Sequence, residues 1–154
     1  MVKRRQEVRG KYKNLIVVDD FAHHPRAVEL TIDGISTQYP NKKIHVIMEP
    51  NSATARSAIF QEEFTQSLNK ANSVIFTKPT RPTSVKNTSD LDIQKIVNYV
   101  TSTGRIGVVA NNLSDLNIEI EKIAKEDSIL LILSNGTCLG LWESDFVSNL
   151  KPVV

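Results

Sequence analysis

The segment Leu15–Pro25 constrains the fold of this chain more than any other stretch. Four apolar residues are followed by two carboxylates, a Phe-Ala pair, two imidazoles and a proline. An uninterrupted apolar run is typical of a strand buried on both faces, and proline suits the first turn of a helix. The segment therefore predicts a strand, a polar turn and a helix start, and ligands of open α/β sheets bind at such turns.

The same pattern recurs along the chain and predicts the fold class. Further apolar runs lie at 44–48, 73–76, 106–110 and 129–133. The segments between them carry apolar residues at helical spacing, and we expect helices at 25–39, 54–71, 90–102, 114–125 and after Gly136. The prediction is an α/β, Rossmann-like, doubly wound domain with a mostly parallel sheet and helices on both faces. A short strand at 6–10, followed by a turn at 10–13, would lie antiparallel at the edge.

Length, charge and cysteine content narrow the function classes. The chain has 154 residues, a net charge of +2, a single cysteine and no apolar run of the ~20 residues that a membrane span needs. We expect one domain in the cytoplasm, with no secretory signal, because no apolar segment follows the basic N-terminus. No membrane partner is expected.

Basic residues are concentrated at the N-terminus. The first 13 residues hold six of them, opposed only by Glu7: Lys3, Arg4, Arg5, Arg9, Lys11 and Lys13. The first interpretation is a solvated arm or edge strand, and the second is a site for an anion on a small ligand. Nucleic acid is the weakest alternative and is not the expected partner, because no aromatic residues interleave the run.

Polar residues follow every predicted parallel strand. These segments are 19–24, 49–54, Lys78, 111–112 and 134–136. Parallel strands end at one edge of a sheet, so the candidate site lies there. The chain lacks both Gly-x-Gly-x-x-Gly and the phosphate-binding Gly-x-x-x-x-Gly-Lys-Ser/Thr. An aspartate at a strand end could still accept both hydroxyls of a ribose.

The histidines and the cysteine have alternative interpretations. His23 is either a hydrogen-bonding group in a cleft or a residue that only satisfies backbone groups at the helix start. His23 and His24 are adjacent and point in different directions, so they make a poor metal pair. Asp19, Asp20 and His23 could bind a metal, but no ligand spacing supports it, and we expect no metal site. Cys138 is expected to be an inert thiol.

Four strings carry a resemblance to a known family. Residues 2–10 read VKRRQEVRG, residues 19–25 read DDFAHHP, residues 49–52 read EPNS and residues 134–136 read SNG. Together they resemble the C-terminal domain of the Mur ligases over about residues 3–150. Within the family they are most similar to the ligases that join L-alanyl-γ-D-glutamyl-meso-diaminopimelate to UDP-N-acetylmuramate in peptidoglycan recycling.

The resemblance implies a division of labour between three domains. An N-terminal domain holds UDP-N-acetylmuramate, and a central domain supplies the ATP loop and the ligands of Mg²⁺. The C-terminal domain closes over ATP and binds the incoming amino acid or peptide. The muramoyl carboxylate is phosphorylated, and the amine then attacks the acyl phosphate. The residues that match the ATP-ribose contacts are Arg5 and Asp20. Those that match substrate contacts are His23, Asn51, Ser52, Thr54, Arg56, Ser134, Asn135 and Gly136.

The chain also departs from the family pattern. Asn51 replaces an arginine that would clamp a substrate carboxylate, and Arg56 is the expected substitute. Thr137, Cys138 and Leu139 replace glycines and an aromatic residue. The UDP-sugar and central domains are absent from residues 1–154, so we expect a fragment or a split gene product that does not ligate alone. The rival hypothesis is a free-standing nucleotide- or peptide-binding module on the same fold.

Overall fold

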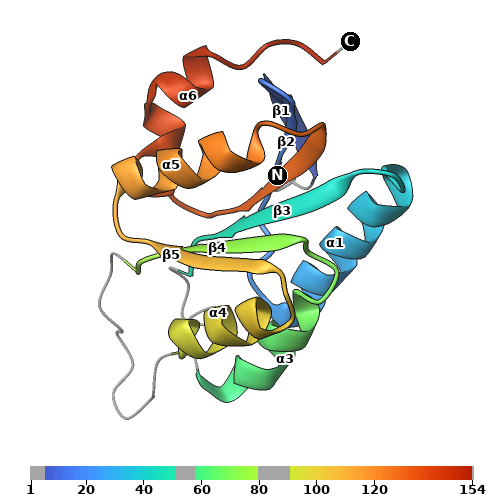
Figure 1. The fold of residues 1–154 in the computed structure, drawn as a ribbon, viewed down its shortest axis with the longest axis vertical. Coiled ribbons are helices and arrows are strands. Elements are labelled where there is room, and N and C mark those ends of the chain that lie inside the picture. Colours follow the sequence, from blue (N-terminus) through green and yellow to red (C-terminus); the bar gives the residue numbers. More distant parts are fainter. Residues whose placement is uncertain (1–5, 51–57, 80–90, 154) are drawn as a thin grey trace.

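The computed structural model of the chain describes residues 6–50, 58–79 and 91–153 (Figure 1). Six strands form one sheet in the order β1-β2-β6-β3-β4-β5. Their bounds are β1 Glu7–Tyr12, β2 Leu15–Asp20, β3 Lys43–Met48, β4 Ser73–Thr77, β5 Ile106–Ala110 and β6 Ser128–Leu133. Every neighbouring pair is parallel except β1 and β2, which are antiparallel. The predicted parallel sheet with an antiparallel edge strand is confirmed.

Helices cover both faces of this sheet, as Figure 1 shows. One face carries α1 Pro25–Gln38, η1 Ala58–Phe60, α3 Gln61–Ser67 and α4 Ile93–Ser102. The other face carries α5 Leu113–Ile123, η2 Leu141–Glu143 and α6 Asp145–Ser148. The chain first proceeds across the sheet from β2 through β3 and β4 to β5. Then α5 crosses the opposite face, which brings β6 between β2 and β3 and completes the doubly wound arrangement.

The first helix follows directly from its sequence. Pro25 occupies its first turn, and the His24 side chain accepts a hydrogen bond from the backbone N–H of Arg26, which caps the helix. Val28, Ile32 and Ile35 recur at helical spacing and are all buried against the sheet. The predicted strand, turn and helix start at 15–25 are therefore confirmed, with α1 ending one residue before the predicted Tyr39.

The predicted turn at 10–13 is wrong. Strand β1 continues to Tyr12, and the chain reverses at 13–14 instead. Gly10 lies at a register shift within the strand with φ +142°, where a Cβ would come within 2.8 Å of the Lys151 carbonyl oxygen. Glycine is needed because the C-terminal segment crosses β1 at this point: Lys11 and Lys151 exchange backbone hydrogen bonds of 2.7 and 2.9 Å.

Three predicted helices are shorter than expected by more than one residue. The helix after Gly136 is two short pieces, η2 and α6, because Ser144 between them is extended and its side chain caps the second. Helix α4 begins at Ile93, since Asp92 caps it by accepting from the N–H of Lys95. Helix α3 ends at Ser67, and the start predicted for it at residue 54 lies outside the described residues.

Candidate functional site

The carboxyl ends of the five parallel strands lie along one edge of the sheet. Backbone hydrogen bonds connect neighbouring strand ends: Ser134 N–H donates to the Asp20 carbonyl at 3.4 Å, and Glu49 N–H donates to the Leu133 carbonyl at 2.9 Å. Lys78 N–H likewise donates to the Ala110 carbonyl. The prediction that the polar turns lie along one edge is confirmed for the turns that the structure describes.

Asp20 and His23 line one hollow of about 770 Å³ beside the start of α1. Asp20 is 4% exposed, and both its carboxylate oxygens hold backbone N–H groups. Oδ2 accepts from Gln6 at 2.8 Å and Oδ1 from Ala22 at 2.7 Å. A carboxylate has about four lone-pair sites, so each oxygen keeps capacity for one more donor. The hollow and the carboxylate together suit a small ligand with hydroxyl groups.

The two adjacent histidines have different roles. His24 Nδ1 accepts from the backbone N–H of Arg26 at 3.3 Å, and its ring lies edge-on to Phe60 with centroids 5.0 Å apart. His23 Nδ1 lies 3.1 Å from the Phe21 carbonyl oxygen. A carbonyl only accepts, so Nδ1 carries the hydrogen, and Nε2 of the neutral ring is the acceptor. Both interpretations offered for His23 therefore describe part of its surroundings: it binds a backbone group and lines the hollow.

Glu49 connects the end of β3 to the turn that follows β6. The carboxylate is buried, with 5% of the residue exposed. Its Oε1 accepts from the Ser134 hydroxyl at 2.7 Å, and its Oε2 accepts from the Cys138 N–H at 3.0 Å. The sequence singles out the string EPNS but assigns no role to Glu49. The missed signal is a carboxylate directly after an apolar strand, facing a Ser-Asn-Gly turn on the neighbouring strand.

The predicted substrate residues 134–136 surround this carboxylate. Gly136 packs so closely that a Cβ would lie 3.1 Å from Glu49 Oε1 and 3.4 Å from Oε2. Its N–H donates to the Ser134 hydroxyl oxygen at 3.3 Å. The Oδ1 of Asn135 is buried and has no hydrogen-bond partner among the described residues. Of the three, only Asn135 offers an uncommitted side-chain acceptor.

The Cys138 thiol is buried at the end of this turn. Burial raises its pKa, and the carboxylates of Glu49 and Asp19 raise it further. The thiolate is the reactive form, so these surroundings favour an unreactive thiol, as the sequence predicted.

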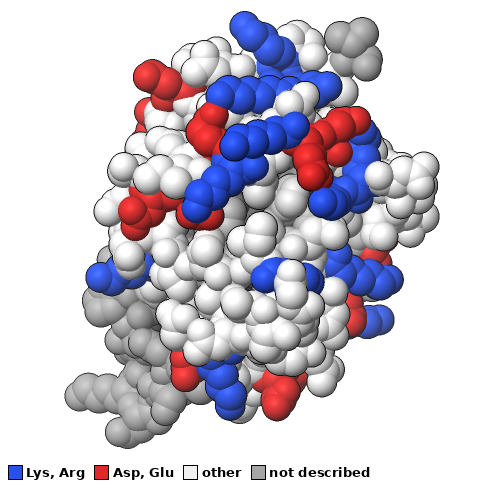
Figure 2. Space-filling view, viewed as in Figure 1, with Lys and Arg blue, Asp and Glu red and all other residues white. Residues whose placement is uncertain are grey.

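Two described residues of the basic N-terminal segment pair with carboxylates of the same chain. Arg9 pairs with Asp19, which is fully buried, and Lys13 pairs with Glu121. Figure 2 shows Lys and Arg side chains gathered at the top of one face, over β1 and the neighbouring helices, with acidic side chains between them. Over its described part, 6–13, the segment is therefore an edge strand in which Arg9 and Lys13 are ion-paired.

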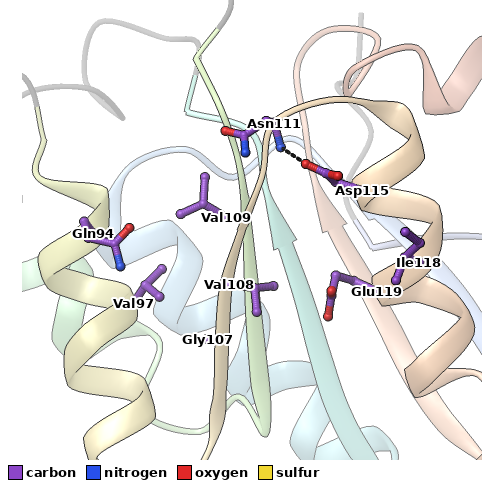
Figure 3. A pocket seen from close by; sticks show the side chains of 9 residues that line it. All are labelled: Gln94, Val97, Gly107, Val108, Val109, Asn111, Asp115, Ile118 and Glu119. Carbon is purple, nitrogen blue, oxygen red and sulfur yellow. Dashed lines mark hydrogen bonds between the residues drawn. The ribbon is translucent and has the colours of Figure 1, made fainter.

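A second hollow, of about 490 Å³, lies along the outer edge of β5 between α4 and α5 (Figure 3). None of the predicted site residues lines it. Its Asp115 carboxylate accepts from the backbone N–H of Asn111 at 3.0 Å, and the neighbouring Asn112 caps α5. These polar groups terminate β5 and start α5, which accounts for them structurally.

The structure leaves part of the predicted site undescribed. The residues outside the described ranges are Arg5, Asn51, Ser52, Thr54 and Arg56. Within the described ranges, no three His, Cys, Asp or Glu side chains are grouped closely enough to hold a metal ion. No helix there has the length and apolar character of a membrane span.

Comparison with known proteins identifies the family. Residues 4–136 match the family described as "Mur ligase, glutamate ligase domain". The chain is 26% identical over 148 residues to UDP-N-acetylmuramate–L-alanine ligase of Desulfatibacillum aliphaticivorans, covering 96% of this chain and 32% of that protein. It is 43% identical over 74 residues to the enzyme of the same name from Bifidobacterium adolescentis, covering 48% and 14%. The chain thus spans about a third or less of the length of these curated relatives.

Two solved structures share the whole fold. The murein peptide ligase of Psychrobacter arcticus superposes with a TM-score of 0.73 at 28% identity, covering 99% of this chain and 31% of that one. A domain of a Haemophilus ducreyi protein, described as a UDP-N-acetylmuramate:L-alanyl-γ-D-glutamyl-meso-diaminopimelate ligase, gives 0.70 at 26% identity, covering 94% and 99%. The family match and the shared fold agree with the resemblance seen in the four sequence strings. This chain belongs to the Mur ligase family and corresponds to its C-terminal domain.

Proposed function

We propose that this chain acts as the C-terminal domain of an ATP-dependent amide-bond ligase, which joins an amine substrate to UDP-N-acetylmuramate. One observation carries the proposal. In a chain of this family, the Asp20–His23 hollow and the turn at 134–138 lie at the same edge of the sheet. The first would bind ATP and the second the incoming amine. Because ATP and UDP-N-acetylmuramate are both nucleotides, the proposal implies a cytoplasmic reaction.

The ATP part of the proposal rests on Asp20. A ribose presents two hydroxyl donors, and the carboxylate oxygens of Asp20 each have a lone pair beyond their backbone bonds. The hollow of about 770 Å³ lies within the usual size range of small-molecule sites. Arg5, the second predicted ribose contact, would approach from the segment that precedes Gln6.

The chemistry proposed for the whole ligase has two steps. The muramoyl carboxylate takes the γ-phosphoryl group of ATP and ADP leaves; the amine then attacks the acyl phosphate and inorganic phosphate leaves. This chain would hold the ATP ribose and the amine substrate, and its closure would bring the reactants together. The described residues contain no cluster that fits Mg²⁺, so we assign the magnesium ligands to the central domain.

Two amine substrates are candidates. Two solved structures that share the fold, at 28% and 26% identity, are named as ligases of a murein peptide, which supports L-alanyl-γ-D-glutamyl-meso-diaminopimelate and a role in peptidoglycan recycling. The curated relatives are named as L-alanine ligases, which supports the free amino acid. We propose the peptide as substrate, with Ser134, Asn135, Gly136, Ser52, Thr54 and Arg56 as its contacts and Asn51 in place of the usual arginine.

A binding experiment and an assay test this proposal. ATP, L-alanine and the tripeptide are titrated calorimetrically into this chain and into its Asp20→Ala variant. The control is Asp33→Ala on α1, which removes a partly exposed ion pair with Lys70 outside the hollow. We expect ATP binding that Asp20→Ala abolishes and Asp33→Ala retains. The complete product of the gene is then assayed for ligation of each amine to UDP-N-acetylmuramate. ATP or peptide binding by a gene product that never ligates would favour the free-standing binding module.

The domain assignment has its own test. We propose that residues 1–154 form a single domain that needs UDP-sugar and central domains to act. Ligation by the 154-residue chain alone would refute this. Dependence of ligation on added domains would support it.

A further inference from the structure

The turn that follows β6 is fixed to β3 by one buried side chain. Glu49 accepts from the Ser134 hydroxyl at the start of the turn and from the Cys138 N–H at its end. A buried carboxylate is tolerated only when hydrogen bonds replace its lost hydration. The conformation of residues 134–138 and the burial of Glu49 therefore depend on each other.

Gly136 shows how closely the turn wraps around this carboxylate. A Cβ there would lie 3.1 and 3.4 Å from the two Glu49 oxygens, so a side chain would press on the carboxylate and shift it slightly. The Gly136 N–H also donates to the same Ser134 hydroxyl that donates to Glu49. The turn is thus hydrogen-bonded to Glu49 at its first and fifth residues and leaves little room beside the carboxylate at its third.

Asn135 is the residue that these contacts hold in place. It lies between Ser134 and Gly136, and its Oδ1 is a buried acceptor without a partner among the described residues. An unsatisfied buried acceptor is costly, and a ligand that donates a hydrogen bond would relieve that cost. An amine or ammonium group is such a donor, and it is the reacting group of the proposed substrate.

We propose that Glu49 is a positioning residue, which fixes the turn at 134–138 so that Asn135 can bind the amino group of the incoming substrate. The inference rests on the proposed ligase function and extends it to a residue that contacts no substrate. The Asp20 carboxylate is held by its own bonds to Gln6 and Ala22, and Asp20 contacts the turn through a long backbone bond, from Ser134 N–H to its carbonyl at 3.4 Å. We therefore expect the ATP side of the site to depend on Glu49 much less than the amine side does.

The test uses Glu49→Gln, which keeps the shape of the side chain but turns one oxygen into an N–H donor. Its matched control is Ser73→Ala, which removes a buried hydrogen bond of 2.6 Å to His45 at the opposite end of the sheet. Cys138 is the chain's single cysteine, so its reaction rate with dithiobis(nitrobenzoate) reports opening of the turn. The KM values for ATP, L-alanine and the tripeptide are measured on the complete gene product.

We expect Glu49→Gln to speed Cys138 labelling at least tenfold and to raise the KM of the ligated amine at least tenfold, with the KM of ATP within twofold. Ser73→Ala should do neither. The inference would be overturned if Glu49→Gln left the rate of Cys138 labelling or the KM of the amine unchanged. It would also be overturned if Glu49→Gln and Ser73→Ala were labelled at equal rates. If Glu49→Gln does not fold, Glu49→Asp replaces it with the same expectations, because it keeps the charge but shortens the side chain that reaches Ser134 and Cys138.

Failure of the proposed function would look different. In that case the wild-type gene product would ligate neither amine, and the role of Glu49 in amine binding would fall with it. A wild-type enzyme that ligates an amine, with a Glu49→Gln variant of unchanged kinetics, would refute the positioning role alone.

Discussion

Arg9 and Asp19 form an ion pair between the antiparallel edge strand and β2, with Arg9 Nη1 donating to Asp19 Oδ2 at 3.1 Å. The Asp19 side chain is fully buried, whereas 27% of the Arg9 side chain is exposed. The guanidinium also lies over the Trp142 ring, 4.7 Å from its centroid. A single side chain therefore connects β1, β2 and η2, at the edge of the sheet that carries the candidate site.

Replacing Arg9 should destabilise the fold. We expect Arg9→Leu to lower the free energy of unfolding by about 2–4 kcal/mol, because a buried carboxylate loses a charged partner. Urea unfolding of the chain measures this. The control is Arg26→Leu, which removes an exposed ion pair with Glu29 and should cost under about 0.5 kcal/mol. A similar loss in the free energy of unfolding for both variants would show that the Arg9–Asp19 pair stabilises the fold no more than an exposed ion pair does.

The fold was predictable because its strongest signals are local. Apolar runs such as 129–133 need no knowledge of their neighbours, and they identify the five parallel strands. Gly10 was misplaced because its role is non-local: it makes room for the carbonyl of Lys151, a residue about 140 positions away. The predicted last helix is interrupted at Ser144, and the sequence does not show this because a serine can either continue a helix or cap a new one.

The candidate site was predictable only in part. The ends of apolar strands can be predicted from sequence, so the polar turns after β2 and β6 were identified as candidate site residues. Glu49 was missed because its partners Ser134 and Cys138 lie on another strand, and a lone carboxylate after a strand does not show whether it faces a ligand or a turn. The basic run was interpreted as a solvated arm or an edge strand, and the edge strand is what the structure shows for Arg9. The sequence did not show the partner of Arg9, because Asp19 comes beside it only once the two strands pair.

His45 should make stability depend on pH. Burial and the nearby Lys43 lower the pKa of its imidazole from 6.5 to about 4, although Glu126 opposes the shift. Between these values the unfolded chain takes up a proton that the folded chain excludes. The free energy of unfolding should therefore fall as the pH drops from about 6.5 to about 4, by up to about 3 kcal/mol.

The measurement is urea unfolding across this pH range, with His45→Asn as the control. Asparagine can still hydrogen-bond to Ser73 but does not titrate. The free energy of unfolding of the variant should therefore depend less on pH between about 6.5 and about 4. Parallel pH profiles for the two proteins would contradict the assigned pKa.

Two glycines should respond to alanine in opposite directions. At Gly136 an added Cβ presses on the Glu49 carboxylate, so Gly136→Ala should cost about 1–3 kcal/mol. Gly34 lies within α1, where an added Cβ meets only the end of the flexible Gln6 side chain. Gly34→Ala should therefore stabilise by about 0.5–1 kcal/mol. Thermal and urea unfolding report both changes.

A double-mutant cycle assigns the Gly136 effect to its cause. In a Glu49→Ala background the carboxylate is gone, and Gly136→Ala should cost at least about 1 kcal/mol less than in the wild-type chain. Equal costs in both backgrounds would trace the effect to the backbone of the turn instead.

The adjacent histidines provide a test that separates stability from function. His24 caps α1 and packs on Phe60, so His24→Ala should lower the free energy of unfolding by about 1 kcal/mol and leave kcat/KM within about threefold. Both histidines are exposed and line the hollow with Asp20, but His24 Nδ1 already accepts from the Arg26 N–H, and the proposed substrate contact is His23. His23→Ala should therefore leave stability within about 0.5 kcal/mol, yet reduce kcat/KM of the complete gene product about tenfold, as loss of one substrate hydrogen bond would. If His23→Ala instead changes the free energy of unfolding and kcat/KM by the same amounts as His24→Ala, His23 only stabilises the start of α1. Two residues with the same structural role should give the same pattern of effects.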